Sequence, residues 1–197
     1  LCVVHLEIIF SGRVNPPIKN KAAAIDTRPR YSTMAAMSMP TVLAFMAHPA
    51  DAEFLCAGAL FLLADIGFEV HVAAMAPGDC GSPDKPADEI AAIRREEGRR
   101  AAALYPGEFH CLEERDLQIH YSPATTKKAC SLFRKLRPEI VITQSPVDYM
   151  LDHEETARIA RAACFNAPIP NAPCEDDSAP LDRIPHLYYA NAVESVG

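Results

Sequence analysis

The feature that most constrains the fold is an alternation of short apolar runs and segments of helical length, which begins at Thr41. The runs TVLAFMA over 41–47 and EVHVAAMA over 69–76 have the length of strands that are buried on both faces. Between them the segment FLCAGALFLLADIG, residues 54–67, is apolar on most faces of a helix. A strand, a helix and a second strand in this order predict a parallel βαβ unit.

The alternation continues to the end of the chain. Three more helices are expected over 88–104, 124–137 and 152–165, and three more strands over 109–113, 139–145 and 186–190. Asp88 is the expected cap of the first of these helices, and Pro138 ends the second. Asp152 and Glu155 have the spacing of a capping box for the third. These elements predict an α/β protein with a three-layer α/β/α, Rossmann-like fold and a mainly parallel sheet.

The remaining segments lack these periodic patterns. Residues 1–39 show no sustained period, so we expect a loosely packed N-terminal extension there and a single domain over 40–197. Five of the 17 prolines lie within 168–185, which predicts that this stretch is largely loop.

Composition excludes several classes of protein. A chain that is 49% apolar and 23% charged is typical of a folded domain, and its 19 basic and 26 acidic residues give 19 − 26 = −7. That balance lacks the basic surface that nucleic acid or anionic lipid needs, and no apolar run reaches the roughly 18 residues of a membrane span. The seven scattered cysteines include no CxxC pair, which argues against a disulfide framework and favours a reducing compartment, the cytoplasm.

Polar residues stand where two of the predicted strands end. His48 and Asp51 follow the first strand, and His153 follows the strand over 139–145. In parallel sheets function collects beyond the carboxyl ends of the strands. Two imidazoles and one carboxylate are the ligand set of a zinc site that keeps a position open for water. A single histidine after a strand is more often a hydrogen-bonded packing residue, so these residues alone leave a structural role open.

Four motifs in register resemble the PIG-L family, also called LmbE-like, of zinc-dependent N-deacetylases that act on N-acetylglucosamine-type sugars. They are AHPADAEF at 47–54, PGDCGS at 77–82, IRREE at 93–97 and SPVDYMLDH at 145–153, within a likeness that covers 41 to about 173. The resemblance implies that His48, Asp51 and His153 bind Zn²⁺, although such a ligand set also accepts other divalent ions.

The resemblance has further implications for the whole molecule. It implies a small amino-sugar substrate and assembly into homo-oligomers, as family members often show. The family domain normally continues past the strand near Tyr188, so the domain over 40–197 is expected to be truncated at its C-terminus.

Two positions depart from the family pattern. The family usually has an aspartate, the general base, where this chain has Ala50, and a methyl group cannot accept a proton. Many members carry a histidine where this chain has Met150. We therefore expect a weakened deacetylase, with a catalytically inactive, zinc-containing sugar-binding protein as the alternative.

Three nearby carboxylates are candidates for a substitute base: Glu53, Asp148 and Asp152. Glu53 lies in the first turn of a predicted helix, where interaction with the helix dipole is the simpler role. Asp152 adjoins a predicted ligand and suits the orientation of an imidazole better than proton transfer. The sequence does not decide the role of Asp148.

Residues of the second and third motifs are candidate substrate contacts. Gly78, Asp79 and Ser82 lie in a turn that either faces the substrate or only connects a strand to a helix. Arg94 either braces the site from behind or forms a surface ion pair with Glu97. The lone Cys80 is expected to be only a small side chain. Histidines 5, 71, 110, 120 and 186 have no partner at ligand spacing and are predicted to be surface or packing residues.

Overall fold

The computed structural model describes residues 39–191, so the predicted N-terminal extension over 1–39 lies almost wholly outside the described residues. The strands are β1 (Thr41–Met46), β2 (Glu69–Ala74), β3 (Glu108–Cys111), β4 (Ile140–Thr143) and β5 (His186–Tyr189). The helices are α1 (Asp51–Leu55), α2 (Ala57–Asp65), α3 (Ala87–Ala102), α4 (Pro123–Leu136) and α5 (Leu151–Asn166). The predicted strands are confirmed, and 168–185 contains neither helix nor strand, as its prolines predict.

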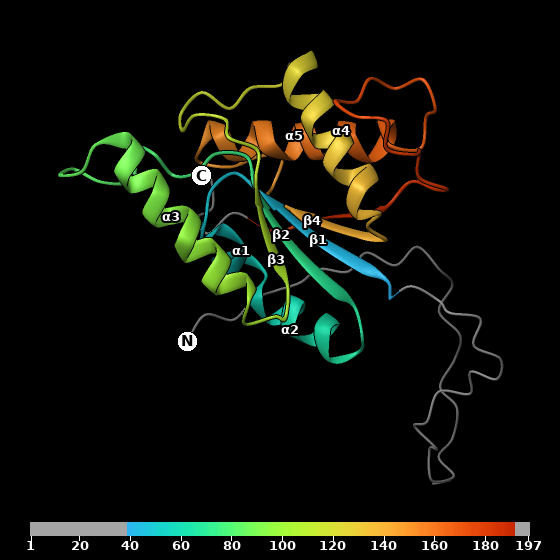
Figure 1. The fold of residues 1–197 in the computed structure, drawn as a ribbon, viewed down its shortest axis with the longest axis horizontal. Helices are drawn as coiled ribbons and strands as arrows, with labels where there is room; N and C mark the ends of the chain where they lie inside the picture. Colours follow the sequence, from blue (N-terminus) through green and yellow to red (C-terminus); the bar gives the residue numbers. More distant parts are fainter. Residues whose placement is uncertain (1–38, 192–197) are drawn as a thin grey trace, which may run out of the picture. The chain divides into compact units, whose positions relative to one another are not determined.

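The five strands form one parallel sheet in the order β3-β2-β1-β4-β5 (Figure 1). Val42 in β1 lies opposite Val70 of β2 on one side and Ile140 of β4 on the other. The chain adds strands on one side of β1 up to β3 and then returns to the other side with β4. The carboxyl ends of β1 and β4 therefore meet at the point where the winding direction changes, which is where open α/β sheets bind ligands.

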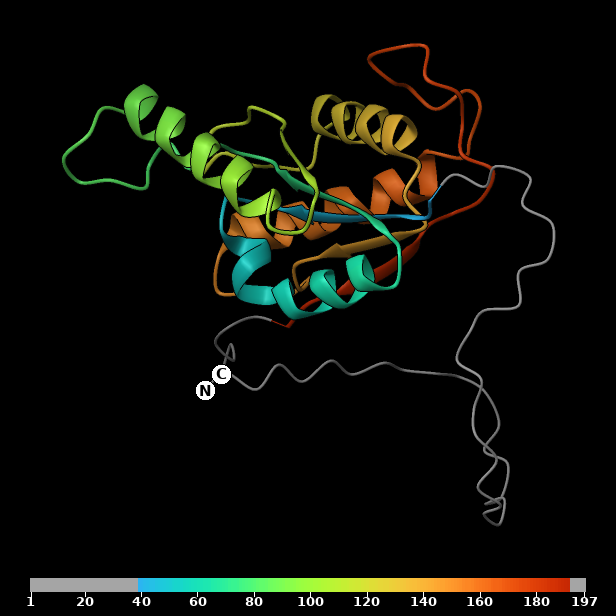
Figure 2. The ribbon, with the colours of Figure 1, turned by 60° about the horizontal axis from the view of Figure 1, so that its bottom comes forward.

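Helices cover both faces of the sheet and give the predicted three layers (Figure 2). On one face, β1 packs against α4 and α5, with the ring of Phe45 edge-on to that of Phe133 at a centroid distance of 5.3 Å. On the other face, Met46 and Leu60 belong to a second buried cluster with α1, α2 and the end of α3. No helix within residues 39–191 is long and apolar enough to cross a membrane.

Two local predictions about helices are corrected. The segment 54–67 is not one helix, because Cys56 has φ −144° and separates α1 from α2. Both short helices pack on the same apolar cluster. The apolar pattern therefore continues across the break, and the sequence does not reveal it. At α3 the cap position belongs to Pro86, and Asp88 lies inside the first turn, where its charge favours the helix dipole instead.

The predicted capping box at the start of α5 is also wrong. Met150 is the residue at the cap position, and its side chain makes no capping hydrogen bond. Asp152 is buried and its carboxylate contacts the imidazole of His48, while Glu155 accepts a hydrogen bond from the backbone N–H of Tyr121. Both carboxylates serve tertiary contacts, which override the local capping signal.

Candidate metal centre

The turns after β1 and β4 bring His48, Asp51 and His153 together. One ligand atom from each residue lies within 4.8 Å of the others. His48 and Asp51 come from the turn that enters α1, and His153 comes from the first turn of α5. Neighbouring parallel strands end at the same edge of the sheet, so residues separated by about half the chain converge there.

The carboxylate of Asp51 is held in place by two hydrogen bonds to Oδ2. The backbone N–H of His48 donates at 2.8 Å and the Nε2 amide of Gln144 donates at 2.7 Å. Gln144 is fully buried, and its Oε1 accepts from the backbone N–H of Ala47 at 2.9 Å. Gln144 was not predicted as a site residue, although a polar side chain directly after a largely buried strand is a signal for such a role.

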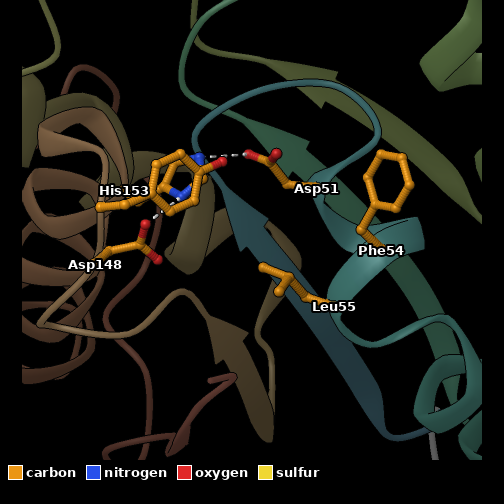
Figure 3. A pocket seen from close by; sticks show the side chains of 6 residues that line it. Asp51, Phe54, Leu55, Asp148 and His153 are labelled. Carbon is orange, nitrogen blue, oxygen red and sulfur yellow. Dashed lines mark hydrogen bonds and ion pairs between the residues drawn. The ribbon is translucent and has the colours of Figure 1, made fainter. Parts of the chain in front are cut away.

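Each imidazole has one nitrogen on a second carboxylate and the other toward Asp51. Nε2 of His48 lies 3.0 Å from Asp152 Oδ2, and Nδ1 of His153 lies 3.1 Å from Asp148 Oδ1. Nδ1 of His48 lies 3.5 Å from Asp51 Oδ2. Nε2 of His153 lies 3.7 Å from the same oxygen (Figure 3). A carboxylate accepts the proton of the nitrogen that it contacts, which leaves the other nitrogen with a free lone pair. This is the arrangement that metal-binding histidines use.

The charge at the site also fits a bound cation. Burial lowers the pKa of His48, but the carboxylates of Asp51, Asp116 and Asp152 outweigh burial and raise the pKa above its ordinary value. Among the described residues, neither lysine nor arginine forms an ion pair with these carboxylates or with Asp148. The donor set of two imidazoles and a carboxylate, surrounded by uncompensated acidic groups, suits a divalent transition ion.

The residue between the two ligands of the first motif has an unusual backbone. Ala50 has φ 81° and ψ −15°, in the left-handed region that alanine rarely adopts. Its methyl group supplies no proton acceptor. Glu53, three residues later, is half-buried, and its pKa is raised by burial and by the charge of Asp51. Within the described part of the chain, its side chain has no hydrogen bond or ion pair to the predicted ligands.

Asp116, which was not predicted as a site residue, stabilises the loop of the second motif through hydrogen bonds. Its two carboxylate oxygens accept hydrogen bonds from the backbone N–H groups of Gly78 and Cys80, both at 3.0 Å. Asp79 is 5% exposed and accepts from the backbone N–H of Asp116 at 2.9 Å. Gly78 and Asp79 thus hold the loop, and their contact with a substrate remains a prediction.

Arg94 reaches the first motif from behind. Its guanidinium donates to the backbone carbonyl of Pro49 at 2.6 Å, and none of the ion pairs within 39–191 joins it to Glu97. A Cβ at Gly78 would stand 3.0 Å from Nε of Arg94, so glycine leaves room for the arginine. The hydroxyl of Ser82 accepts from two backbone N–H groups of the following turn. Arg94 thus contacts the backbone of the first motif, and its role at the site remains a prediction.

A small pocket of about 60 Å³ lies beside Asp51 and His153, two of the three predicted ligands. It is lined by Asp51, Phe54, Leu55, Asp148, Tyr149 and His153 (Figure 3). The side chains of Phe54 and Tyr149 are 76% and 56% exposed, and the ring of Tyr149 packs edge-on against His153 at 5.5 Å. The pocket combines aromatic walls with the polar cluster, as small-molecule sites commonly do.

Known proteins are similar to this chain in sequence and in fold. The profile of the family described as PIG-L: GlcNAc-PI de-N-acetylase matches residues 43–164. Diacetylchitobiose deacetylase from Thermococcus kodakarensis is 29% identical over 155 residues, which are 76% of this chain and 57% of that protein. The 4-oxalmesaconate hydratase from Pseudomonas putida is 26% identical over 131 residues, 62% of this chain and 51% of that protein. The chain thus spans about half the length of these curated relatives.

Solved structures agree with the sequence matches. N,N'-diacetylchitobiose deacetylase from Pyrococcus horikoshii superposes with a TM-score of 0.65 at 29% identity, over 68% of this chain and 52% of that one. Protein TT1542 from Thermus thermophilus gives a TM-score of 0.69 at 24% identity, over 81% of this chain and 69% of that one, and this likeness concerns the fold alone.

Proposed function

The chain belongs to the PIG-L family, and from this we propose that it is a metal-dependent hydrolase that removes the acetyl group from an N-acetylglucosamine-type sugar. The observation that carries the proposal is the cluster of His48, Asp51 and His153 within 4.8 Å of one another, at the edge of the pocket. The 29% identity to a diacetylchitobiose deacetylase supports the class of substrate. We propose Zn²⁺ as the ion, because it suits two imidazoles and one carboxylate.

The side chains of the site would bind the ion, orient its ligands and contact the sugar. His48, Asp51 and His153 would hold the ion, which supplies a Lewis acid for the amide carbonyl and lowers the pKa of water. Asp148 and Asp152 accept the outward imidazole protons at 3.1 and 3.0 Å, so that the inner lone pairs face the ion. The exposed rings of Phe54 and Tyr149 would contact the apolar face of the sugar.

Proton transfer is the step in which this chain departs from its family. Loss of a positioned general base typically costs about 10²- to 10⁴-fold in rate. Asp148 and Asp152 are each bonded to an imidazole, and Glu53 lies outside the cluster. We therefore propose a weakened hydrolase. The same Ala50 favours a second candidate, a zinc-containing protein that binds amino sugars without hydrolysing them.

The test compares the chain with its Ala50→Asp and Ala50→Asn variants. Asn matches Asp in shape and in its tolerance of the left-handed backbone, but it cannot accept a proton. The measurements are zinc content by elemental analysis and release of acetate from N-acetylglucosamine and N,N'-diacetylchitobiose. We expect about one zinc per chain at this centre in all three proteins, and a gain in turnover of about 10²- to 10⁴-fold only in Ala50→Asp.

Other outcomes select between the candidates. Zinc at this centre without turnover in any variant would favour the sugar-binding protein. A zinc content that does not change when His48 and His153 are both replaced by alanine would reject both candidates.

A further inference from the structure

A second cluster of metal-ligating side chains lies away from the pocket. One ligand atom from each of His71, Glu108 and His110 lies within 4.8 Å of the others. The sequence predicted these histidines to be packing or surface residues, since 39 positions separate them. We propose that this cluster is a second metal site, which takes a divalent transition ion such as Zn²⁺. The proposal does not depend on the proposed function.

The register of the sheet creates the cluster. His71 of β2 lies opposite Glu108 of β3, and Ala73 lies opposite His110. Residues two apart on neighbouring parallel strands point to the same face, which here is the face covered by α4. His71 is 5% exposed, Glu108 is exposed and His110 is half-buried. Because β3 is an edge strand, the cluster opens to solvent at the side of the sheet, which gives an ion a way in.

As at the first centre, an imidazole has one nitrogen near a carboxylate, here that of Glu69. Nδ1 of His71 lies 3.0 Å from Nε2 of His110, and Nε2 of His71 lies 3.4 Å from Oε1 of Glu69. If Glu69 accepts the Nε2 proton, the lone pair of Nδ1 points toward His110. Two nitrogens bound to one ion at about 2.0–2.1 Å each lie roughly 3 Å apart. A direct hydrogen bond between the two rings gives the same distance between the nitrogens. A measurement of metal binding is therefore needed to distinguish a metal site from a hydrogen bond.

The donors also define the kind of ion. Two imidazoles and a carboxylate favour Zn²⁺, Co²⁺ or Ni²⁺ over Mg²⁺ and Ca²⁺, which prefer oxygen ligands. The carboxylates of Glu69 and Glu108 would offset the charge of the ion. The pKa of His110 is lowered mainly by burial and by the nearby His71. The positive charge of Lys135 in α4 lowers it further, and this lysine would oppose a cation on this face.

The experiment first removes the other centre. In a His48→Ala/His153→Ala variant of the full chain, zinc that remains reports on the second site. We expect about one equivalent of Zn²⁺ in this variant and a rise in its Tm on addition of Zn²⁺, because the ion binds the folded state. Adding His110→Ala should abolish both effects. His120→Ala is the matched control, since among residues 39–191 the only hydrogen-bond partner of its exposed imidazole is the carbonyl of Gln118.

A second, more conservative substitution tests the site even if His110→Ala prevents the protein from folding. Glu69→Gln changes a half-exposed side chain and should weaken zinc binding by about 10- to 100-fold, because the orienting carboxylate is lost. Zinc stoichiometry and Tm response that are the same with and without His110→Ala would overturn the proposal. If the first centre is the one that fails, the unmutated chain binds one zinc and loses it in His110→Ala, so the two failures are distinguishable.

Discussion

Replacing Asp148 or Asp152 by asparagine tests whether these carboxylates position the ligands or transfer the proton. Each contacts one imidazole nitrogen, at 3.1 and 3.0 Å, and Asp152 also accepts from the backbone N–H of Leu117 at 2.7 Å. Asparagine keeps an oxygen that accepts hydrogen bonds but removes the charge that strengthens the imidazole as a ligand. We expect zinc affinity at the first centre to fall by about 10- to 100-fold, which is about 1.4–2.7 kcal/mol.

The assay separates affinity from turnover. A chelator competition gives the zinc Kd of each variant, and acetate release at saturating zinc, in an Ala50→Asp background, gives kcat. Asp88→Asn is the control, since that side chain is fully exposed on α3. A positioning carboxylate changes the Kd and leaves kcat at saturating zinc nearly unchanged. An unaltered Kd with a kcat lower by about 10²-fold or more would refute our reasoning and identify that carboxylate as a base.

Three further predictions concern stability and thiol chemistry. Ala50→Gly removes the steric strain of the left-handed backbone at this position. After the entropy cost of glycine is deducted, the free energy of unfolding, measured by urea denaturation, should rise by about 0.5–1 kcal/mol. A decrease would show that the alanine is not strained. Gly98→Ala would place a Cβ 2.7 Å from the ring of Phe109, and its cost of about 1–3 kcal/mol should exceed the helix-propensity gain in the same assay. The thiols of Cys130 and Cys174 lie 3.1 Å apart, so oxidised glutathione should form an intramolecular disulfide, two hydrogens lighter by mass spectrometry; recovery of the glutathione adduct alone would speak against it.

The order of the strands and helices could be predicted because the central strands β1, β2 and β4 are largely buried on both faces. Thr41 to Met46 are all buried, so β1 is a continuous apolar run that periodicity detects. The rule that ligands gather at the carboxyl ends of parallel strands then selected His48, Asp51 and His153, which the structure brings within 4.8 Å. Pattern and topology together therefore predict that these three residues lie close together, whereas their role as metal ligands is what the family resemblance implies.

The supporting contacts could not be predicted in the same way. Asp116 bonds the backbone of Gly78, 38 positions away, and Gln144 bonds Asp51, 93 positions away. The position of Gln144 after a buried strand marks it as a polar residue with a role, but neither contact leaves a local pattern that identifies its partner, since each depends on which loops the fold places side by side. The failed capping box has the same origin, because the local signal at Asp152 is identical whether the carboxylate caps its own helix or contacts His48.

The contacts that hold the predicted ligands do not involve the side chain at position 50. Asp51 is held by the backbone of His48 and by Gln144, and His48 is held by Asp152, so none of these bonds involves the side chain of Ala50. The backbone at Ala50 keeps a left-handed conformation that aspartate and asparagine adopt more readily than alanine. We therefore predict that metal binding and proton transfer are separable at this site. A single substitution at position 50 should change the rate of hydrolysis while the affinity for the ion stays the same.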